Sequence, residues 1–534
     1  MGGSTEMPFG DHLIIMPILL PMLAGIVLVL IEERYHAVKL AISIIATLAL
    51  LLVSVILLAQ VDGGAQASIG VYRLGDWPAP FAIVLVADRL AALMVTLSAV
   101  LAIAAMTFSA ARWHSAGPHF HSLFQLLLMG LNGAFLTGDL FNLFVFFEIL
   151  LAASYGLALH GSGPARVRAG LHYVAFNLAA SSLFLIGVSL IYGVTGTLNM
   201  ADLATRIAAI PSESRPLFDA GLALLGIAFL VKAGMWPLSF WLPATYGAAS
   251  APVAAIFAIM SKVGIYVLLR LSGLLGAELD GFGHDWMFFG GMATMLFGTV
   301  GVLSSQELPR MTGFAVLLSS GTVLAMLGYG DPGVTAGAMY YLIASSLGLA
   351  CLFLLAELME RGRPIEADVF AVTLEAFGDD EVETDGDIGI AVPATMALLT
   401  VSFGGCAVLL TGMPPLAGFV GKFAMLRSML GAQIGGSIPV GTWWLMAFVV
   451  LSGLASMIAL LRAGINRFWA PTDEHVPRVR VVEMAPIALL LGLGVGLTLL
   501  AGPVMGTIQT MSAGLYDPAT YIEAVLGSLA GRTP

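Results

Sequence analysis

The chain has 534 residues, of which 59% are hydrophobic and 10% are charged, and its formal net charge at pH 7 is −11. Soluble proteins carry about 25% charged residues, so this composition excludes a water-soluble enzyme. The mean hydropathy of +0.96 agrees with that exclusion. The negative net charge and the lack of a basic patch argue against a nucleic-acid partner. We therefore expect a polytopic protein in a lipid bilayer.

Apolar stretches of membrane-spanning length follow one another along the chain. A spanning helix needs about 20 apolar residues. The stretch 391–430 is too long for one span and is interrupted by Met413-Pro414-Pro415, so we expect a broken or re-entrant helix there. The predicted fold is all-α, with about fourteen transmembrane helices at residues 12–31, 38–60, 81–109, 121–138, 140–160, 171–193, 217–242, 250–272, 286–305, 311–328, 334–358, 391–430, 441–463 and 484–503.

Charges outside these spans predict the orientation. The residues before the first span include Glu6 and Asp11 but no Lys or Arg, so we expect no cleavable signal. With the N-terminus outside, the inner loops hold twelve Lys and Arg residues and the outer segments hold seven, which predicts a non-cytoplasmic N-terminus. The segment 364–388 carries nine acidic residues and is typical of a solvated cytoplasmic loop. Residues 198–212 are predicted to form an amphipathic surface helix.

Two similar motifs predict an internal repeat. Gly234-Met235-Trp236-Pro237-Leu238 lies in the seventh span, and Gly412-Met413-Pro414-Pro415-Leu416 lies 178 residues later in the twelfth. Because five spans separate them, the two copies have opposite orientations in the membrane. Proline removes a backbone donor, and the carbonyls it frees need water or polar side chains. Paired breaks in inverted halves are typical of a transporter-like core facing a hydrated cavity.

Lysines are rare in this chain and are placed unusually. Of the four, only Lys39 belongs to a loop, whereas Lys232, Lys262 and Lys422 fall inside predicted spans. A charge at mid-bilayer costs about 2.5–3.5 kcal/mol on insertion scales. Such lysines must be paired, hydrated or neutral, and a lysine can lose its proton when it is desolvated. We expect a lateral row of proton-carrying sites bridged by water.

One carboxylate lies equally deep. Glu148 follows four apolar residues in the fifth span and has no neighbour in sequence with which to pair. Its partner must come from another helix, and Lys232 is the predicted one. The alternative is a static ion pair that only holds helices together.

Other polar residues are weaker candidates. Asp139 and Asn142 stand at the mouth of the fifth span, where they are candidates for contact with a cation; the alternative is an ordinary helix start. His172 opens the sixth span near the inner surface and is a candidate for proton relay.

No cofactor or metal is expected. The spacing of His114, His119 and His121 is not typical of a metal site. Cys351 and Cys406 lie in apolar stretches and suggest neither a disulfide nor metal ligation. There is no dinucleotide fingerprint and no P-loop.

Three segments in combination resemble one known family. They are residues 138–148 (GDLFNLFVFFE), 232–238 (KAGMWPL) and 412–419 (GMPPLAGF). They resemble the antiporter-like subunits of respiratory complex I, of related hydrogenases and of the Mrp-type multisubunit cation/proton antiporters. The ends of the chain, 12–21 and 517–527, resemble the D-type subunits of the Mrp antiporters, particularly their Pha-like branch. The length also favours the D type over the much longer A type.

The resemblance implies a fold of fourteen spans. Spans four to eight and nine to thirteen form two inverted five-helix repeats, and helices seven and twelve are broken. The expected division of the chain is therefore three N-terminal helices, a first repeat, a second repeat with an acidic cytoplasmic loop at 359–390, and a last helix with the C-terminal segment, at residues 1–120, 121–272, 286–463 and 464–534.

The resemblance also implies a hydrated proton path in the membrane plane, formed by Glu148, Lys232, Lys262 and Lys422. There is one departure from the family. Many relatives carry a histidine or lysine in span eleven, whereas here that span has no ionisable side chain but tyrosine. The link between the last two lysines then uses water or hydroxyls, or is weaker. The hydroxyl candidates are Tyr340, Tyr341, Ser345 and Ser346.

The implied function is that of a membrane component in a multisubunit antiporter that exchanges Na⁺ or K⁺ for H⁺. The chain would be part of a secondary transporter in a bacterial inner membrane and not an enzyme, with partners of the A, B, C, E, F and G types. One alternative is a proton-pumping subunit of a redox complex such as complex I or a membrane hydrogenase. The others are a structural subunit with a vestigial channel, which the intact Glu/Lys set disfavours, and a self-sufficient transporter.

Overall fold

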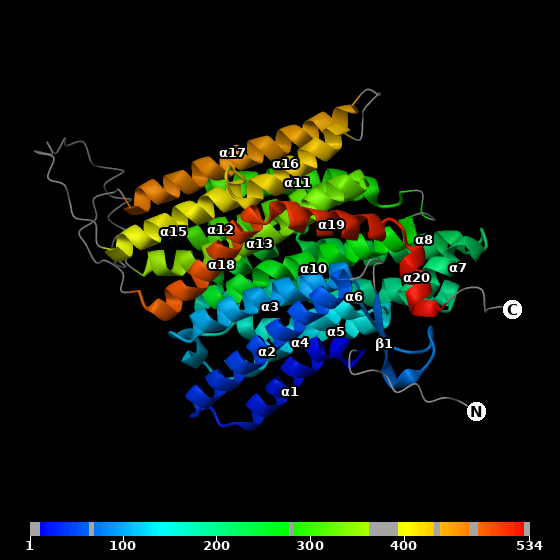
Figure 1. Ribbon diagram of the computed structural model, residues 1–534, viewed down its shortest axis with the longest axis horizontal. Coiled ribbons are helices and arrows are strands. Elements are labelled where there is room, and N and C mark those ends of the chain that lie inside the picture. The colour runs from blue at the N-terminus through cyan, green and yellow to red at the C-terminus, as the bar shows by residue number, and fades with distance from the viewer. Residues whose placement is uncertain are drawn as a thin grey trace, which may run out of the picture.

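The structure is a computed structural model that describes residues 11–63, 69–276, 279, 281–361, 394–431, 438–468 and 479–527. Nearly all of its helices lie side by side along one direction (Figure 1). Twelve helices in these ranges are long and apolar enough to cross a membrane, and two shorter apolar ones, Met16–Leu30 (α1) and Phe120–Leu136 (α4), lie among them. The predicted all-α membrane fold is confirmed. The acidic segment 364–388 lies outside the described residues.

The N-terminal helices differ from the prediction at one point. They are α1, α2 (His36–Asp62) and α3 (Arg89–Ser109). The third span was expected from residue 81, but Val84–Ala87 form a strand, β2, which pairs antiparallel with β1 (Gly70–Arg73). The apolar run is buried as a strand, and the Asp88 side chain accepts a hydrogen bond from the Ala91 N–H and starts the helix.

The next helices follow the predicted spans four to eight. They are α4, α5 (Leu140–Ala158), α6 (Pro164–Thr195), α8 (Arg215–Ala233), α9 (Trp241–Ala248) and α10 (Ala251–Leu275). The segment predicted as a surface helix contains α7 (Met200–Arg206), followed by a 3₁₀ turn at Ile207–Ala209. Its apolar side is not free, because Met200 and Leu203 are buried and α7 packs against α10 and the C-terminal helix α20 (Ala519–Leu526).

The second set of helices has a similar order. It comprises α11 (His284–Ser304), α12 (Leu308–Tyr329), α13 (Pro332–Glu360), α15 (Ala394–Thr411), α16 (Ala417–Gly431) and α17 (Val440–Phe468). The broken helices α8 and α9 both pack against α6, and α15 and α16 both pack against α13. This shared order supports two repeats, whose inverted relation stays a prediction.

The last span ends earlier than predicted. We expected it to end at residue 503, but α18 (Val481–Leu499) is followed after a bend at Leu500 by α19 (Ala501–Leu515). The bend has a local cause, since Pro503 has no N–H for the carbonyl of Leu499. Both helices pack along α13.

Both predicted helix breaks are present. Gly234 after α8 and Gly412 after α15 have φ angles of +75° and +70°, a left-handed conformation that favours glycine. The first break is partly satisfied by another helix, because the Trp236 N–H donates to Thr294 Oγ1 at 2.9 Å. The breaks thus interrupt the two helices that carry Lys232 and Lys422.

The buried centre of the bundle is formed by α10 and α13. In each of them 94% of an apolar 18-residue stretch is buried, against 28% of the corresponding stretch in α2 and in α18. Helices α1 and α17 lie at opposite edges of the bundle, and α10 and α13 lie between them (Figure 1). Lys262 and Ser345 therefore lie in the interior.

A buried ion pair ties α3 to α10. Both guanidinium NH groups of Arg270 donate to Asp88, one of them at 2.7 Å. Asp88→Asn is expected to destabilise the protein by about 3–5 kcal/mol, because asparagine still caps α3 but leaves the Arg270 charge unpaired. A thermal melt of the purified complex measures this loss. The double variant Asp88→Asn/Arg270→Met is expected to regain part of it, and a melt no better than that of the single variant would contradict this explanation.

Candidate functional site

The three lysines of the predicted spans are buried in three separate helices. Lys232 lies at the end of α8, Lys262 in the middle of α10, and Lys422 in α16, with exposed fractions of 5%, 0% and 8%. Glu148 lies in the middle of α5, and its Oε1 atom is buried. Lys39, the fourth lysine, was expected in a loop, but it lies in the first turn of α2 and pairs with Glu33 at 2.7 Å.

Glu148 and Lys232 do not form the expected direct ion pair. Lys232 Nζ lies 4.8 Å from the centroid of the Phe147 ring and within electrostatic range of Glu148. Neither Lys232 Nζ nor Glu148 Oε1 has a hydrogen-bond partner within the described chain. A buried polar atom without a partner is costly, so both atoms indicate bound water.

A small cavity adjoins Lys232. Its lining includes Asn177, Tyr173 and Trp241, and it leaves space for about one water molecule. The Trp241 Nε1 atom is also buried without a partner in the described residues. Water in this cavity would satisfy the ammonium and the indole together. The arrangement favours a hydrated proton site over a static ion pair.

Lys262 is bound by hydroxyl groups. Its Nζ donates to Ser319 Oγ at 3.0 Å and to Ser320 Oγ at 2.9 Å, both on α12. Ser319 Oγ in turn lies 2.8 Å from Ser345 Oγ on α13. The sequence reasoning missed the two serines of α12, because it looked for hydroxyls only in span eleven; Ser319 and Ser320 are likewise adjacent serines in an apolar span.

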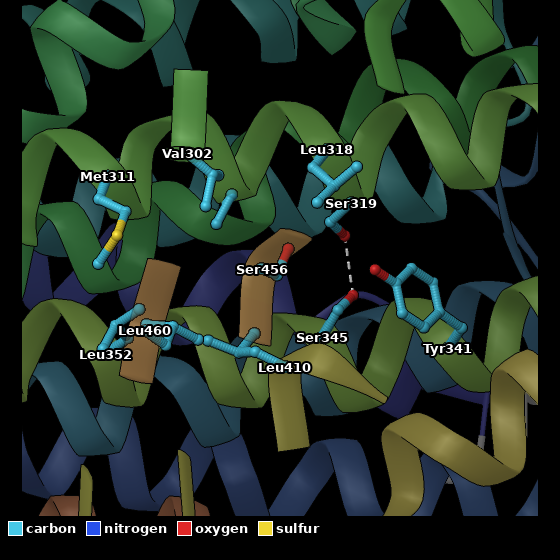
Figure 2. A pocket seen from close by; sticks show the side chains of 11 residues that line it. Val302, Met311, Leu318, Ser319, Tyr341, Ser345, Leu352, Leu410, Ser456 and Leu460 are labelled. Atoms are coloured by element: carbon cyan, nitrogen blue, oxygen red, sulfur yellow. Dashed lines mark hydrogen bonds between the residues drawn. The ribbon is translucent and has the colours of Figure 1, made fainter. Parts of the chain in front are cut away.

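A second cavity lies beyond this serine pair (Figure 2). It is large enough for a water molecule. The hydroxyl of Tyr341 points toward the Ser319–Ser345 hydrogen bond (Figure 2). The cavity is formed between α11, α12, α13, α15 and α17, and its lining is Val302, Met311, Ala315, Leu318, Ser319, Tyr341, Ser345, Leu352, Leu410, Ser456 and Leu460.

Lys422 also lies near Tyr341. Its Nζ is 5.9 Å from the centroid of the Tyr341 ring. It donates to the carbonyl oxygen of Thr411, the last residue of α15, at 2.8 Å. Lys422 thus satisfies a carbonyl that the helix break leaves open.

Gly453 on α17 keeps Lys422 in this position. A Cβ atom on Gly453 would lie 3.0 Å from both Lys422 Nζ and the Thr411 carbonyl oxygen. Gly453→Ala is expected to displace the ammonium, destabilise the protein by about 1–3 kcal/mol and slow transport. Melting and transport of the variant complex measure both effects. Gly404→Ala is the matched control, because a Cβ there meets nothing within 4 Å; equal behaviour of the two variants would contradict this role.

Three of the predicted relay candidates lie apart from the buried lysines and the two cavities. The Tyr340 hydroxyl donates to the Leu497 carbonyl at 2.7 Å, toward α18. Ser346 Oγ is buried without a partner in the described chain, and it lines neither cavity. His172 is exposed on α6.

Asp139 and Asn142 form a helix start. Asp139 Oδ1 accepts from the Asn142 N–H at 2.9 Å, and Asn142 Nδ2 donates to Thr137 Oγ1 at 3.0 Å. These are the contacts of an N-cap, the alternative that the sequence left open.

The histidines near the start of α4 and the two cysteines have the surroundings of packed side chains. The ring centroids of His114 and His121 are 5.7 Å apart, and burial together with the neighbouring His36 lowers the pKa of His114. Cys351 and Cys406 are buried as free thiols. Within the described ranges, no three His, Cys, Asp or Glu residues are grouped to hold a metal ion.

Comparisons with known proteins show the family of this chain. A family model described as "NADH:quinone oxidoreductase/Mrp antiporter, TM" matches residues 137–455. The chain belongs to this family. It is 55% identical over 528 residues to a protein of Rhizobium meliloti (strain 1021) named as the probable D subunit of a K(+)/H(+) antiporter, covering 97% of this chain and 98% of that one. It is 34% identical over 523 residues to the D subunit of the Na(+)/H(+) antiporter of Alkalihalophilus pseudofirmus, covering 97% and 99%. The resemblance to D-type subunits is confirmed.

Two solved structures contain chains with the same fold as this chain. A chain of the Mrp complex from Dietzia sp. DQ12-45-1b superposes with a TM-score of 0.82 and 26% identity, covering 98% of this chain and all of that one. A chain of respiratory complex I from Thermus thermophilus superposes with a TM-score of 0.73 and 22% identity, covering 97% and 100%. At that identity the second match shows the fold alone.

Proposed function

We propose that this chain is the D-type membrane subunit of a multisubunit monovalent cation/proton antiporter. The observation that carries the proposal is the set of three spanning lysines, each buried without an ion pair among the described residues, in a chain similar throughout its length to D-type antiporter subunits. The chain is a transporter component and not an enzyme. It works with subunits of the A, B, C, E, F and G types in a bacterial cell membrane, with its N-terminus on the non-cytoplasmic side.

The proton path consists of Glu148, Lys232, Lys262 and Lys422. Burying an unpaired ammonium is costly, and a lysine, unlike an arginine, can avoid that cost by releasing its proton. The partnerless atoms of the first two residues and the hydroxyls around the third are the surroundings such an exchange needs. The path crosses from the first repeat, 121–272, to the second, 286–463.

The exchanged cation is K⁺ or Na⁺. The relative at 55% identity is named for K⁺, and the one at 34% identity is named for Na⁺. The higher identity favours K⁺ for this chain.

The test is a transport assay on the assembled complex in everted vesicles. Addition of K⁺ or Na⁺ is expected to collapse a pH gradient generated by respiration. The purified complex is expected to show no flavin or iron–sulfur absorbance. An assembled complex that responds to neither cation and carries such absorbance would favour the redox-linked pump. Exchange activity of this chain expressed alone would favour a self-sufficient transporter.

A further inference from the structure

We propose that Lys262 and Lys422 are connected by a hydroxyl relay, in which Ser319 and Ser345 pass the proton into the water-holding cavity beside Tyr341. The inference deepens the proposed function and rests on it, because it requires a proton to move between the two lysines. It names the groups that act where span eleven lacks an ionisable side chain.

The first links are direct hydrogen bonds. Lys262 Nζ lies 3.0 Å from Ser319 Oγ, and Ser319 Oγ lies 2.8 Å from Ser345 Oγ. Both distances are those of well-formed hydrogen bonds. All three side chains are at most 2% exposed, so bulk water does not compete with these bonds. Ser345 also reaches the Leu342 carbonyl, at a longer distance of 3.2 Å.

The next link is water in the cavity. A buried water needs space for one molecule and two to four polar partners. The cavity offers that space, and hydroxyls of Ser319, Tyr341, Ser345 and Ser456 line it. Ser456 donates to the Ser452 carbonyl at 2.8 Å, so its oxygen is left as an acceptor. Figure 2 shows Tyr341 and the bonded serines around the same space.

The far end of the relay is Lys422. It lies near α13 and α17, which supply Tyr341 and Ser456 to the cavity lining. Its Nζ approaches the Tyr341 ring of α13 and lies beside Gly453 of α17, three residues before Ser456. Lys422 does not itself line the cavity, and we infer from these two contacts that cavity water reaches its amine.

The proton balance of the step is complete. The Lys262 ammonium gives a proton to Ser319 Oγ while Ser319 gives its own to Ser345 Oγ, and Ser345 gives its own to water. The water gives a proton to the neutral Lys422 amine. Each oxygen gains and loses one proton, so only the two lysines change charge. Either serine can be the donor in the bond between them, so the geometry allows both directions.

The sharpest test compares Ser345→Thr with Ser345→Val. The two replacements have nearly the same shape, so any effect of the added methyl group on the cavity water is common to both. Only threonine keeps a hydroxyl. In everted vesicles, exchange by the valine variant is expected to be about tenfold slower than exchange by the threonine variant, the rate equivalent of one lost hydrogen bond. Equal rates for the two assembled variants would overturn the relay.

Two further variants keep the test decisive if valine impairs assembly. Ser319→Ala and Tyr341→Phe add no volume, and each removes one hydroxyl. Wild-type exchange in both would overturn the relay. Ser346→Ala is the matched control, because this neighbouring hydroxyl is buried outside the cavity, and its exchange is expected to be unchanged.

The outcomes separate the relay from the proposed function. If the wild-type complex shows no exchange, the proposed function fails. If the wild type exchanges and Lys262→Met does not, but the hydroxyl variants all match the wild type, only the relay fails.

Discussion

Replacing Glu148 by glutamine is expected to abolish cation/proton exchange in a complex that still assembles. Glutamine keeps the size of the side chain but has neither the charge nor a proton to release. Because Oε1 has no hydrogen-bond partner in the described chain, little of the fold depends on the carboxylate. Lys232, within electrostatic range, would lose the carboxylate that stabilises its protonated form. Exchange is expected below about one hundredth of the wild-type rate, the scale on which a positioned acid–base group acts.

The measurement is cation-driven proton flux in proteoliposomes with matched amounts of complex. Glu148→Asp is the control, since it keeps the carboxylate on a side chain one methylene shorter and is expected to retain part of the flux. Lys232→Ala is expected to resemble the glutamine variant. Full exchange by a well-assembled Glu148→Gln complex would remove Glu148 from the path.

A conservative change of Lys422 to arginine is expected to have an effect of similar size. Arginine keeps the positive charge and can still donate to the Thr411 carbonyl, but it stays protonated at any accessible pH. If Lys422 takes up and releases a proton in every cycle, Lys422→Arg stops the cycle. We expect a loss of about a hundredfold or more in exchange rate.

Size is the competing explanation, because Gly453 leaves little space beside Lys422 Nζ. Lys39→Arg controls for it. Lys39 is also buried, with an exposed fraction of 2%, but it is held by Glu33 in an ion pair that arginine can keep. Lys39→Arg is expected to exchange like the wild type. The melting temperature of both complexes reports any packing defect. Wild-type exchange by Lys422→Arg would show that its charge is static.

The sequence predicted the features that depend on composition and on local chemistry. Apolar length marked the spans, Gly234 and Pro237 marked one helix break, and isolated charges in apolar surroundings marked Glu148 and the three lysines. Each of these patterns depends only on residues that are close together in the sequence. The strand Val84–Ala87 escaped prediction because a short apolar run is equally compatible with a buried helix.

Contacts between helices could not be predicted from the sequence. The bond from Lys262 to Ser319, and that from Ser319 to Ser345, depend on the rotation and depth of three different helices, which no pattern in one helix records. For the same reason the sequence named Lys232 as the partner of Glu148, whereas in the structure neither Glu148 Oε1 nor Lys232 Nζ has a hydrogen-bond partner in the described chain. Among the four hydroxyl candidates of span eleven, the helical rotation of α13 separates Ser345 from Ser346.

The most direct test of a continuous proton path is to remove its middle. Lys262 lies between the carboxylate and lysine of the first repeat and the lysine of the second, and it is fully buried. The measurement is the collapse of a respiration-generated pH gradient by K⁺ or Na⁺ in everted vesicles, with wild-type and Lys262→Met complexes at equal abundance. We predict collapse by the wild type and none above background by the variant. Equal collapse by both would contradict a path through this chain.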